Sequence, residues 1–205
     1  MKTLLLDFGN VVAFFDHRRA SRQLAALAAA PTSESQVFDR VFASPLEPDL
    51  DRGRIPTPEF LRLLRRHLDL SASDDAIATA WCDIFRPNEE LIAQLPRLRP
   101  LVHRLVLASN TNELHFQWIA RQFAAPLALF DELVLSFRVG ARKPEEAFFR
   151  RCVEAAGVPA SRCVFVDDKP EFVEAARNAG MAGLLYRPGL DLTEVLGGRP
   201  QEHPR

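Results

Sequence analysis

Five short apolar runs recur along the chain and predict β-strands. They are rich in leucine and valine and cover residues 3–7, 103–109, 132–136, 162–168 and 182–186. Each run is nearly continuous rather than alternating with polar residues, which is typical of strands buried on both faces of a parallel sheet. The pattern therefore favours a parallel sheet at the centre of the molecule.

Three segments with helical spacing separate the later runs. They cover residues 111–123, 145–156 and 171–179, and Gly157 and Gly180 stand where helices end in a C-terminal cap. Alternation of strands with helices predicts an α/β fold with a doubly wound parallel sheet.

The gap between the first and second runs is too long for one crossover connection. It shows no convincing strand pattern, and its apolar spacing predicts helices over residues 19–29, 35–43, 57–68, 73–85 and 89–98. We interpret most of it as a small helical cap domain over the core. The expected organisation is a core of residues 1–15 and 89–196, a cap of residues 16–88 and a flexible tail of residues 197–205.

One stretch of the expected cap, residues 47–56, is charged and rich in turn-forming residues, and we expect it to be a loop. Four of its charged side chains are interpreted as solvated, namely those of Asp49, Asp51, Arg52 and Arg54.

Composition narrows the class of protein. The chain has 205 residues, 47% of them hydrophobic, and a formal net charge of −1, so nothing indicates a nucleic-acid or anionic-membrane partner. No segment reaches the roughly 18 to 20 apolar residues that span a bilayer, and Asp7 interrupts the first apolar run too early for a signal peptide. Three scattered cysteines favour buried, reduced thiols. We expect a soluble cytoplasmic protein, either a monomer or a homodimer.

Residues that carry chemistry follow the predicted strands. In open α/β sheets, ligands bind outside the carboxyl ends of the strands, so these residues should share one rim. Each alone is compatible with a helix cap, a turn or a solvated lysine, but their joint order indicates a functional site. They are Asp7, Ser109, Asn110, Lys143, Asp167 and Asp168.

Four motifs in the chain resemble those of the haloacid dehalogenase (HAD) superfamily, in the same order. They read LLLDFGNVV, LVLASNTN, GARKPE and VFVDDKPEFVEAARNAGM. The expected cap after the first motif matches the members with a helical cap. The likeness is closest to the group that includes bacterial α-D-glucose-1-phosphate phosphatase, which shares the Asp-x-Gly-Asn-Val start. The resemblance implies a Mg²⁺-dependent phosphatase that acts on a small phosphorylated metabolite, such as a sugar phosphate.

The resemblance also implies a nucleophile and a metal site. Asp7 would attack phosphorus and form an aspartyl phosphate, which water then hydrolyses. Mg²⁺ would bind to Asp7, to the carbonyl oxygen of Gly9 and to Asp168. Asp167 would tune this site or bind the metal through water.

By the same resemblance, three residues would hold the phosphate. Lys143 would neutralise its charge and orient the nucleophile. Ser109 and the backbone N–H of Asn110 would bind a phosphoryl oxygen as charge spreads over the equatorial oxygens in the transition state.

The chain departs from the family pattern two residues after Asp7. Most phosphatases of the superfamily carry there an aspartate that protonates the leaving group, and this chain has Gly9. The effect of such an acid is typically ~10²–10⁴-fold. A leaving group that departs easily, such as an anomeric oxygen, needs less help. Alternatively Asp16, His17 or His115 takes over the role, while an Asp16–Arg19 structural pair is an equally good interpretation of Asp16.

A second departure lies four residues after Asp168, where Phe172 replaces the acidic or amide residue that normally supports a metal-bound water. Together with Gly9 it leaves two alternatives open. One is a catalytically impaired binding or regulatory protein. The other is a metal-independent 2-haloacid dehalogenase, against which the paired carboxylates Asp167 and Asp168 argue, because without a cation they repel an anionic substrate.

Overall fold

A five-stranded parallel sheet lies at the centre of the computed structural model, which describes residues 1–197. The strand order is β5-β4-β1-β6-β7, so the chain builds first on one side of β1 and then on the other. All five predicted strands are confirmed; they are β1 (Thr3–Leu6), β4 (Leu105–Ser109), β5 (Glu132–Leu135), β6 (Cys163–Asp167) and β7 (Ala182–Leu185). The carboxyl ends of β1, β4 and β6 meet at one edge, where the direction of winding changes.

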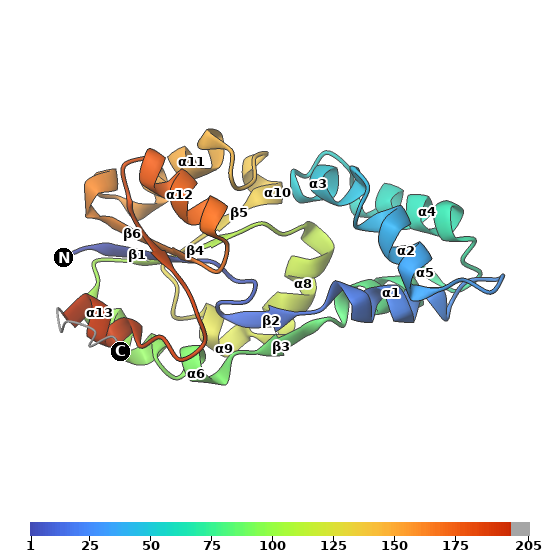
Figure 1. Cartoon of the computed structure of the whole chain (residues 1–205), viewed down its shortest axis with the longest axis horizontal. Coiled ribbons are helices and arrows are strands. Elements are labelled where there is room, and N and C mark those ends of the chain that lie inside the picture. The colour runs from blue at the N-terminus through green and yellow to red at the C-terminus, as the bar shows by residue number, and fades with distance from the viewer. Residues whose placement is uncertain (198–205) are drawn as a thin grey trace, which may run out of the picture.

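Helices cover both faces of this sheet, as the doubly wound prediction requires (Figure 1). Two apolar clusters, one on each face, pack the helices against the strands. One face carries α6 (Glu89–Ile92), α7 (Leu95–Leu98), α8 (Glu113–Gln122), α9 (Ala124–Leu127) and α13 (Leu192–Gly197). The other carries α11 (Glu146–Ala156) and α12 (Pro170–Asn178), with the short helix α10 (Ser136–Val139) after β5. Two 3₁₀ turns, Arg99–Leu101 and Ala160–Arg162, precede β4 and β6.

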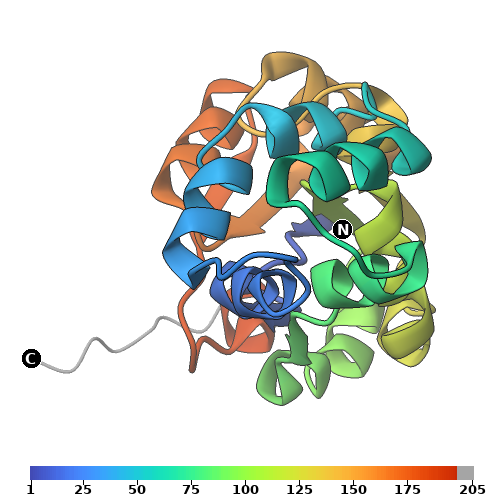
Figure 2. The same cartoon turned by 90° about the vertical axis from the view of Figure 1, so that its right-hand side faces the viewer.

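A second group of helices forms the cap, seen from its outer side in Figure 2. Its own apolar cluster includes Leu24, Phe60, Leu64 and Trp81, all buried. The helices are α1 (His17–Ala25), α2 (Glu34–Val41), α3 (Leu46–Asp51), α4 (Thr57–Leu68) and α5 (Asp74–Cys82). Two antiparallel strands, β2 (Ala13–Phe15) and β3 (Phe85–Pro87), join this cap to the core.

Three expectations for the chain between β1 and β4 are wrong. The gap does contain a strand, β3, which pairs with β2. The helix expected over residues 89–98 is two helices, because Pro96 has no N–H to bond the carbonyl of Ile92, where α6 ends. The loop expected over residues 47–56 contains α3. Of the expected tail, residues 198–205 lie outside the described part of the chain.

The three cysteines are free and buried, as predicted. Burial raises the pKa of Cys82 and of Cys152 to about 12, so neither forms a thiolate at neutral pH. Within residues 1–197, none of the helices combines the length and the apolar character that crossing a membrane demands.

Candidate active site

A cavity of about 130 Å³ lies between the carboxyl edge of the sheet and the cap. The core contributes residues from the loops after β1, β4, α10 and β6, among them Asp7, Ser109, Lys143 and Asp168. The cap and its stem contribute Phe15, His17, Glu47, Asp51 and Phe85. The structure therefore brings the four motif residues together at one rim and encloses them under cap side chains.

Lys143 is the centre of a buried ion cluster. Its Nζ lies 2.7 Å from Oδ1 of Asp7 and 2.6 Å from Oδ2 of Asp167. The lysine side chain is only 1% exposed, so it depends on these carboxylates to compensate for lost hydration. Burial lowers the pKa of Lys143, but the two carboxylates outweigh it and raise that pKa above its usual value. The ammonium group is therefore permanently charged beside the predicted nucleophile.

The carboxylates in this cluster outnumber the buried ammonium group. Burial, opposed by Lys143 and reinforced by Asp167, raises the pKa of Asp7 to about 7. Burial also raises the pKa of Asp168, although Asn10 opposes the shift. A cation at this position would favour the charged form of both carboxylates.

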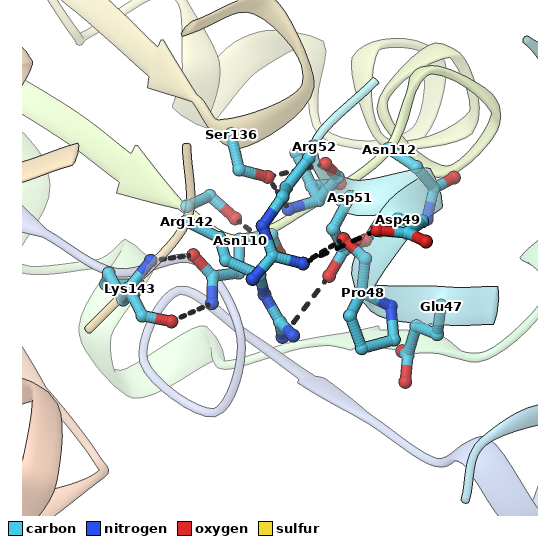
Figure 3. A network of polar contacts seen from close by, with 12 residues as sticks. Glu47, Pro48, Asp49, Asp51, Arg52, Asn110, Asn112, Ser136, Arg142 and Lys143 are labelled. Atoms are coloured by element: carbon cyan, nitrogen blue, oxygen red, sulfur yellow. Dashed lines mark hydrogen bonds and ion pairs between the residues drawn. The ribbon is translucent and has the colours of Figure 1, made fainter. Parts of the chain in front are cut away.

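The loop that carries Lys143 is fixed to the end of β4 by a reciprocal amide pair. The backbone N–H of Lys143 donates to Oδ1 of Asn110 at 2.8 Å, and Nδ2 of Asn110 donates to the carbonyl of Lys143 at 3.1 Å (Figure 3). Ser136 ties the neighbouring loop by donating to the carbonyl of Thr111 and accepting from its N–H. Asn110 thus has a positioning contact besides its predicted part in phosphate binding.

Three carboxylates have oxygens close enough to share one metal ion. Asp7, Asp167 and Asp168 each offer an atom within 4.8 Å of the others. Both oxygens of Asp167 already have donors, the Lys143 ammonium and the Lys169 N–H at 2.9 Å. Asp7 and Asp168 are therefore better placed as ligands. An all-oxygen donor set with two carboxylates fits Mg²⁺.

Asn10 orients Asp168 from the loop after β1. Its Nδ2 donates to Oδ2 of Asp168 at 3.1 Å. The residue has φ of 56°, a left-handed conformation that asparagine tolerates better than most residues. The Asn10 amide thus fixes one oxygen of Asp168 and keeps the Asp168 carboxylate beside that of Asp7.

The structure separates the three candidate replacements for the missing acid. Asp16 caps α1 by accepting from the Arg18 N–H at 2.9 Å, pairs with Arg22 at 3.2 Å, and is not among the residues that line the cavity. The alternative Asp16–Arg19 side-chain pair is not formed either, because Arg19 pairs with Asp83. His17 and His115 do line the cavity.

His115 is engaged through both ring nitrogens. Its Nδ1 lies 3.1 Å from Nδ2 of Asn112, and its Nε2 lies 3.2 Å from the carbonyl of Trp81. Burial, with a contribution from His17, lowers the pKa of His115 to about 3. The ring is therefore neutral and occupied, which suits packing against Trp81 at 5.0 Å between ring centroids.

The place of a side chain at position 9 is taken by an aromatic ring. A Cβ on Gly9 would lie 2.7 Å from Cε1 and 3.1 Å from Cδ1 of Phe15. The Gly9 backbone is not among the glycines with a left-handed φ. A side chain at this position therefore requires the Phe15 ring to shift, whereas the backbone conformation is no obstacle.

This geometry predicts that Gly9→Asp lowers the free energy of unfolding by ~1–3 kcal/mol, as overpacking does. In a Phe15→Ala background the same change should cost at least ~1 kcal/mol less, because the two residues interact directly. Denaturant unfolding of the four proteins in this cycle measures the difference. Equal costs in both backgrounds would show that Phe15 is not the obstacle.

Phe172 forms an apolar wall of the site. Its ring centroid lies 5.2 Å from Nζ of Lys143 and 5.1 Å from Nζ of Lys169. Both distances are within cation–π range. Phe172 therefore supports the two ammonium groups and supplies no oxygen to a metal.

The cap side of the cavity corrects the solvated interpretation of Asp51 and Arg52, whereas the side chains of Asp49 and Arg54 are 38% and 62% exposed. Asp51 is 7% exposed and lies 3.5 Å from Arg142, and Nδ2 of Asn112 donates to it at 3.3 Å. Nε and Nη2 of Arg52 donate to Oε1 of Glu145 at 2.9 and 2.6 Å. These pairs join α3 of the cap to the loop that carries Lys143.

Other lining residues were not singled out in the sequence. Arg142 and Lys169 each stand next to a motif residue, so adjacency to Lys143 and Asp168 was the available signal. No feature of the sequence pointed to Glu47, because its segment was interpreted as a loop.

The sheet order, the cap and the convergent carboxylates with their lysine define a capped, doubly wound α/β fold with an ionised site at the carboxyl edge of its sheet. The sequence profile of haloacid dehalogenase-like hydrolases matches residues 1–180. The chain belongs to this family, as the resemblance implied. The narrower likeness to the glucose-1-phosphate phosphatase group stays a prediction.

Individual proteins and solved structures are also similar to this chain. D-ribitol-5-phosphate phosphatase of Bacteroides thetaiotaomicron is 24% identical over 203 residues, which cover 96% of this chain and 97% of that protein. Drimenol cyclase drtB of Aspergillus calidoustus is 27% identical over 91% of this chain, which spans 34% of that longer protein. The crystal structure of the HAD family enzyme bt-2542 of B. thetaiotaomicron, in complex with magnesium and inorganic phosphate, is 23% identical with a TM-score of 0.81, and the match covers 95% of this chain and 98% of that one.

Proposed function

We propose that the protein is a Mg²⁺-dependent phosphatase that hydrolyses a small phosphorylated metabolite, such as a sugar phosphate, with Asp7 as the nucleophile. The observation that carries the proposal is the enclosed cluster of Asp7, Lys143 and Asp168 beside Ser109, within one cavity of about 130 Å³. The D-ribitol-5-phosphate phosphatase relative supports the substrate class.

In this mechanism Asp7 attacks phosphorus, the ester oxygen departs, and water then releases inorganic phosphate from the aspartyl group. Lys143 neutralises the phosphoryl charge and holds Asp7 in place. The Ser109 hydroxyl and the Asn110 N–H bind a phosphoryl oxygen. A Mg²⁺ ion held by Asp7, Asp168 and the Gly9 carbonyl would supply charge neutralisation between the two anionic partners.

Asp167 completes this arrangement as a positioning residue. It keeps one oxygen on the Lys143 ammonium at 2.6 Å and the other on the Lys169 N–H. Both the lysine and the backbone of the Asp168 loop are therefore oriented by one buried carboxylate.

We also propose the division of the chain into a core of residues 1–15 and 89–196 and a cap of residues 16–88. The paired strands β2 and β3 form the stem between the two parts. The cap would exclude bulk water from the aspartyl phosphate and supply the contacts to the substrate's leaving group.

The test is phosphate release from a panel of phosphorylated metabolites, with Mg²⁺ and with EDTA. We expect EDTA to lower the rate by ~10²-fold or more, because a bound cation typically contributes several kcal/mol at such sites. Excess Mg²⁺ should restore it. A 2-haloacid assayed in parallel for halide release distinguishes the dehalogenase alternative.

Two outcomes would contradict the proposal. Phosphate release that EDTA leaves unchanged would exclude the metal site. No release from any ester, with folded protein and Mg²⁺ present, would favour the non-catalytic alternative.

A further inference from the structure

The cavity contains a carboxyl group of the cap that the family's sequence pattern does not assign. Glu47 lies in the first turn of α3, and its Oε1 is 3.4 Å from Nε2 of His17. Both side chains line the same cavity as Asp7, and they are only 18% and 26% exposed. In Figure 3 the Glu47 side chain extends away from the carboxylates of Asp49 and Asp51.

A series of ring contacts links this pair to the vacant position 9. Phe15 fills the space beside Gly9, and its ring centroid lies 4.8 Å from that of His17. On its other side the His17 ring stacks on Phe42, with 4.3 Å between the ring centroids. The imidazole is thus held between two aromatic rings, with its Nε2 next to the Glu47 carboxyl group.

Burial of Glu47 favours its protonated form at neutral pH. Burial and the nearby Asp51 raise the pKa of Glu47 to about 8, against the opposing effects of Arg142 and Lys169. Burial and Lys169 lower the pKa of His17 to about 4. The pair is therefore a neutral acid beside a neutral imidazole and not an ion pair.

We propose, on the basis of the phosphatase function above, that Glu47 is the catalytic acid of this enzyme, supplied by the cap in place of the residue missing at position 9. As the Asp7–phosphorus bond forms and the phosphorus–oxygen ester bond breaks, the Glu47 proton moves to the departing oxygen. The product is a neutral alcohol, and Glu47 becomes a carboxylate. In the second step that carboxylate takes a proton from the water that attacks the aspartyl phosphate, which restores the acid.

Two features of the cap hold Glu47 in a defined position relative to the core. The α3 helix is joined to the catalytic loop by Arg52–Glu145 and Asp51–Arg142, so Glu47 is held in a fixed relation to Lys143. Gly53, just after α3, has φ of 68°, and a Cβ there would lie 2.4 Å from the carbonyl oxygen of Phe137. The cap helix therefore approaches the core backbone more closely than a residue with a side chain would allow.

The test is the dependence of kcat/KM on the leaving group in Glu47→Gln, which keeps the size and polarity of the side chain but has no acidic proton. For a primary-alcohol phosphate we expect a loss of ~10²–10⁴-fold. For p-nitrophenyl phosphate, whose leaving group departs without a proton, the loss should stay below ~10-fold. Glu59→Gln makes the same chemical change at a glutamate of α4 whose side chain is 43% exposed and pairs with Arg62 of that helix. It is the matched control and should match wild type on both esters.

A pH profile gives a second readout. For the alkyl ester, wild-type kcat/KM should fall as pH rises through about 8, because Glu47 then loses its proton. Glu47→Gln should lack this limb.

If wild type is active and Asp7→Asn is inactive, the phosphatase mechanism stands, and two results would then overturn only the assignment of Glu47. One is an equal loss for both esters, which indicates a role in binding or folding. The other is unchanged rates for both. If instead Asp7→Asn keeps its activity, the phosphatase mechanism itself is wrong, so the two failures are distinguishable.

Discussion

Asp7→Asn is expected to lower the rate of phosphate release by more than ~10³-fold, because the amide cannot form the aspartyl phosphate. The fold should persist. Asparagine is nearly isosteric with aspartate, and its oxygen can still accept from the Lys143 ammonium, which lies 2.7 Å away in wild type. One of the mutually repelling carboxylates is also removed. The measurements are Mg²⁺-supported turnover and the free energy of unfolding by denaturant.

Asp39→Asn is a suitable control, since Asp39 is an exposed aspartate of the cap helix α2. It makes the same chemical change far from the catalytic loops and should leave the rate within about 2-fold of wild type. Retention of most of the wild-type rate in Asp7→Asn would exclude covalent catalysis through Asp7. If Asp7→Asn lost both its activity and its fold, the loss of rate would be explained by unfolding. The free energy of unfolding distinguishes this case from a folded protein that has lost its nucleophile.

Lys143→Met is the second large expected effect, and it acts on both turnover and stability. Methionine has a similar length but no charge, so Asp7 and Asp167 lose the partner that compensates for their burial. Breaking a buried pair by removing one member typically costs ~3–5 kcal/mol. In the proposed mechanism Lys143 stabilises charge in the transition state, so its loss should lower kcat by ~10²–10³-fold.

A second substitution tests the electrostatic origin of this instability. In the Lys143→Met background, Asp167→Asn removes one of the uncompensated carboxylates and should recover part of the lost free energy of unfolding. Lys2→Met, an exposed lysine before β1, should change stability by less than ~0.5 kcal/mol. If Lys143→Met were as stable as wild type, the buried cluster would not depend on its lysine.

The core of the fold was predictable because its signals are strong and local. Strands buried on both faces must be apolar throughout, so β1, β4 and β6 stand out as continuous runs. The edge strands β5 and β7 are partly exposed, but their short apolar runs still gave their positions. The topology of such a sheet then places polar residues that follow the strands at one edge. Asp7 and Asp168 therefore lie beside each other although 160 residues separate them.

The cap was less predictable because its short elements depend on tertiary contacts. The strand β3 has three residues, Phe85–Pro87, and exists through its pairing with β2. The helix α3 has six residues and no side-chain N-cap, so its sequence resembles a charged loop. The position of Glu47 inside the cavity follows from that helix.

The contact between position 9 and the Phe15 ring could not be predicted from the sequence either. The absence of an acid at Gly9 was visible, but the Phe15 ring that fills its place comes from β2, a strand that was not predicted. Asp16, the nearest acidic candidate, is used as a helix cap for α1. The spacing of residues in the sequence does not distinguish an aspartate that caps a helix N-terminus from one that acts as a catalytic acid.

The central claim, that phosphate passes through a covalent bond to Asp7, is tested most directly by the stereochemistry at phosphorus. A phosphate ester made chiral with oxygen isotopes should transfer with overall retention of configuration, because two successive in-line displacements restore the original hand. An acceptor alcohol takes the place of water in the second step, so that the product is again a chiral phosphate ester whose configuration can be determined. Retention in wild type, with no turnover in Asp7→Asn, is the predicted result. Inversion would show a single direct attack by the acceptor and would contradict the covalent mechanism.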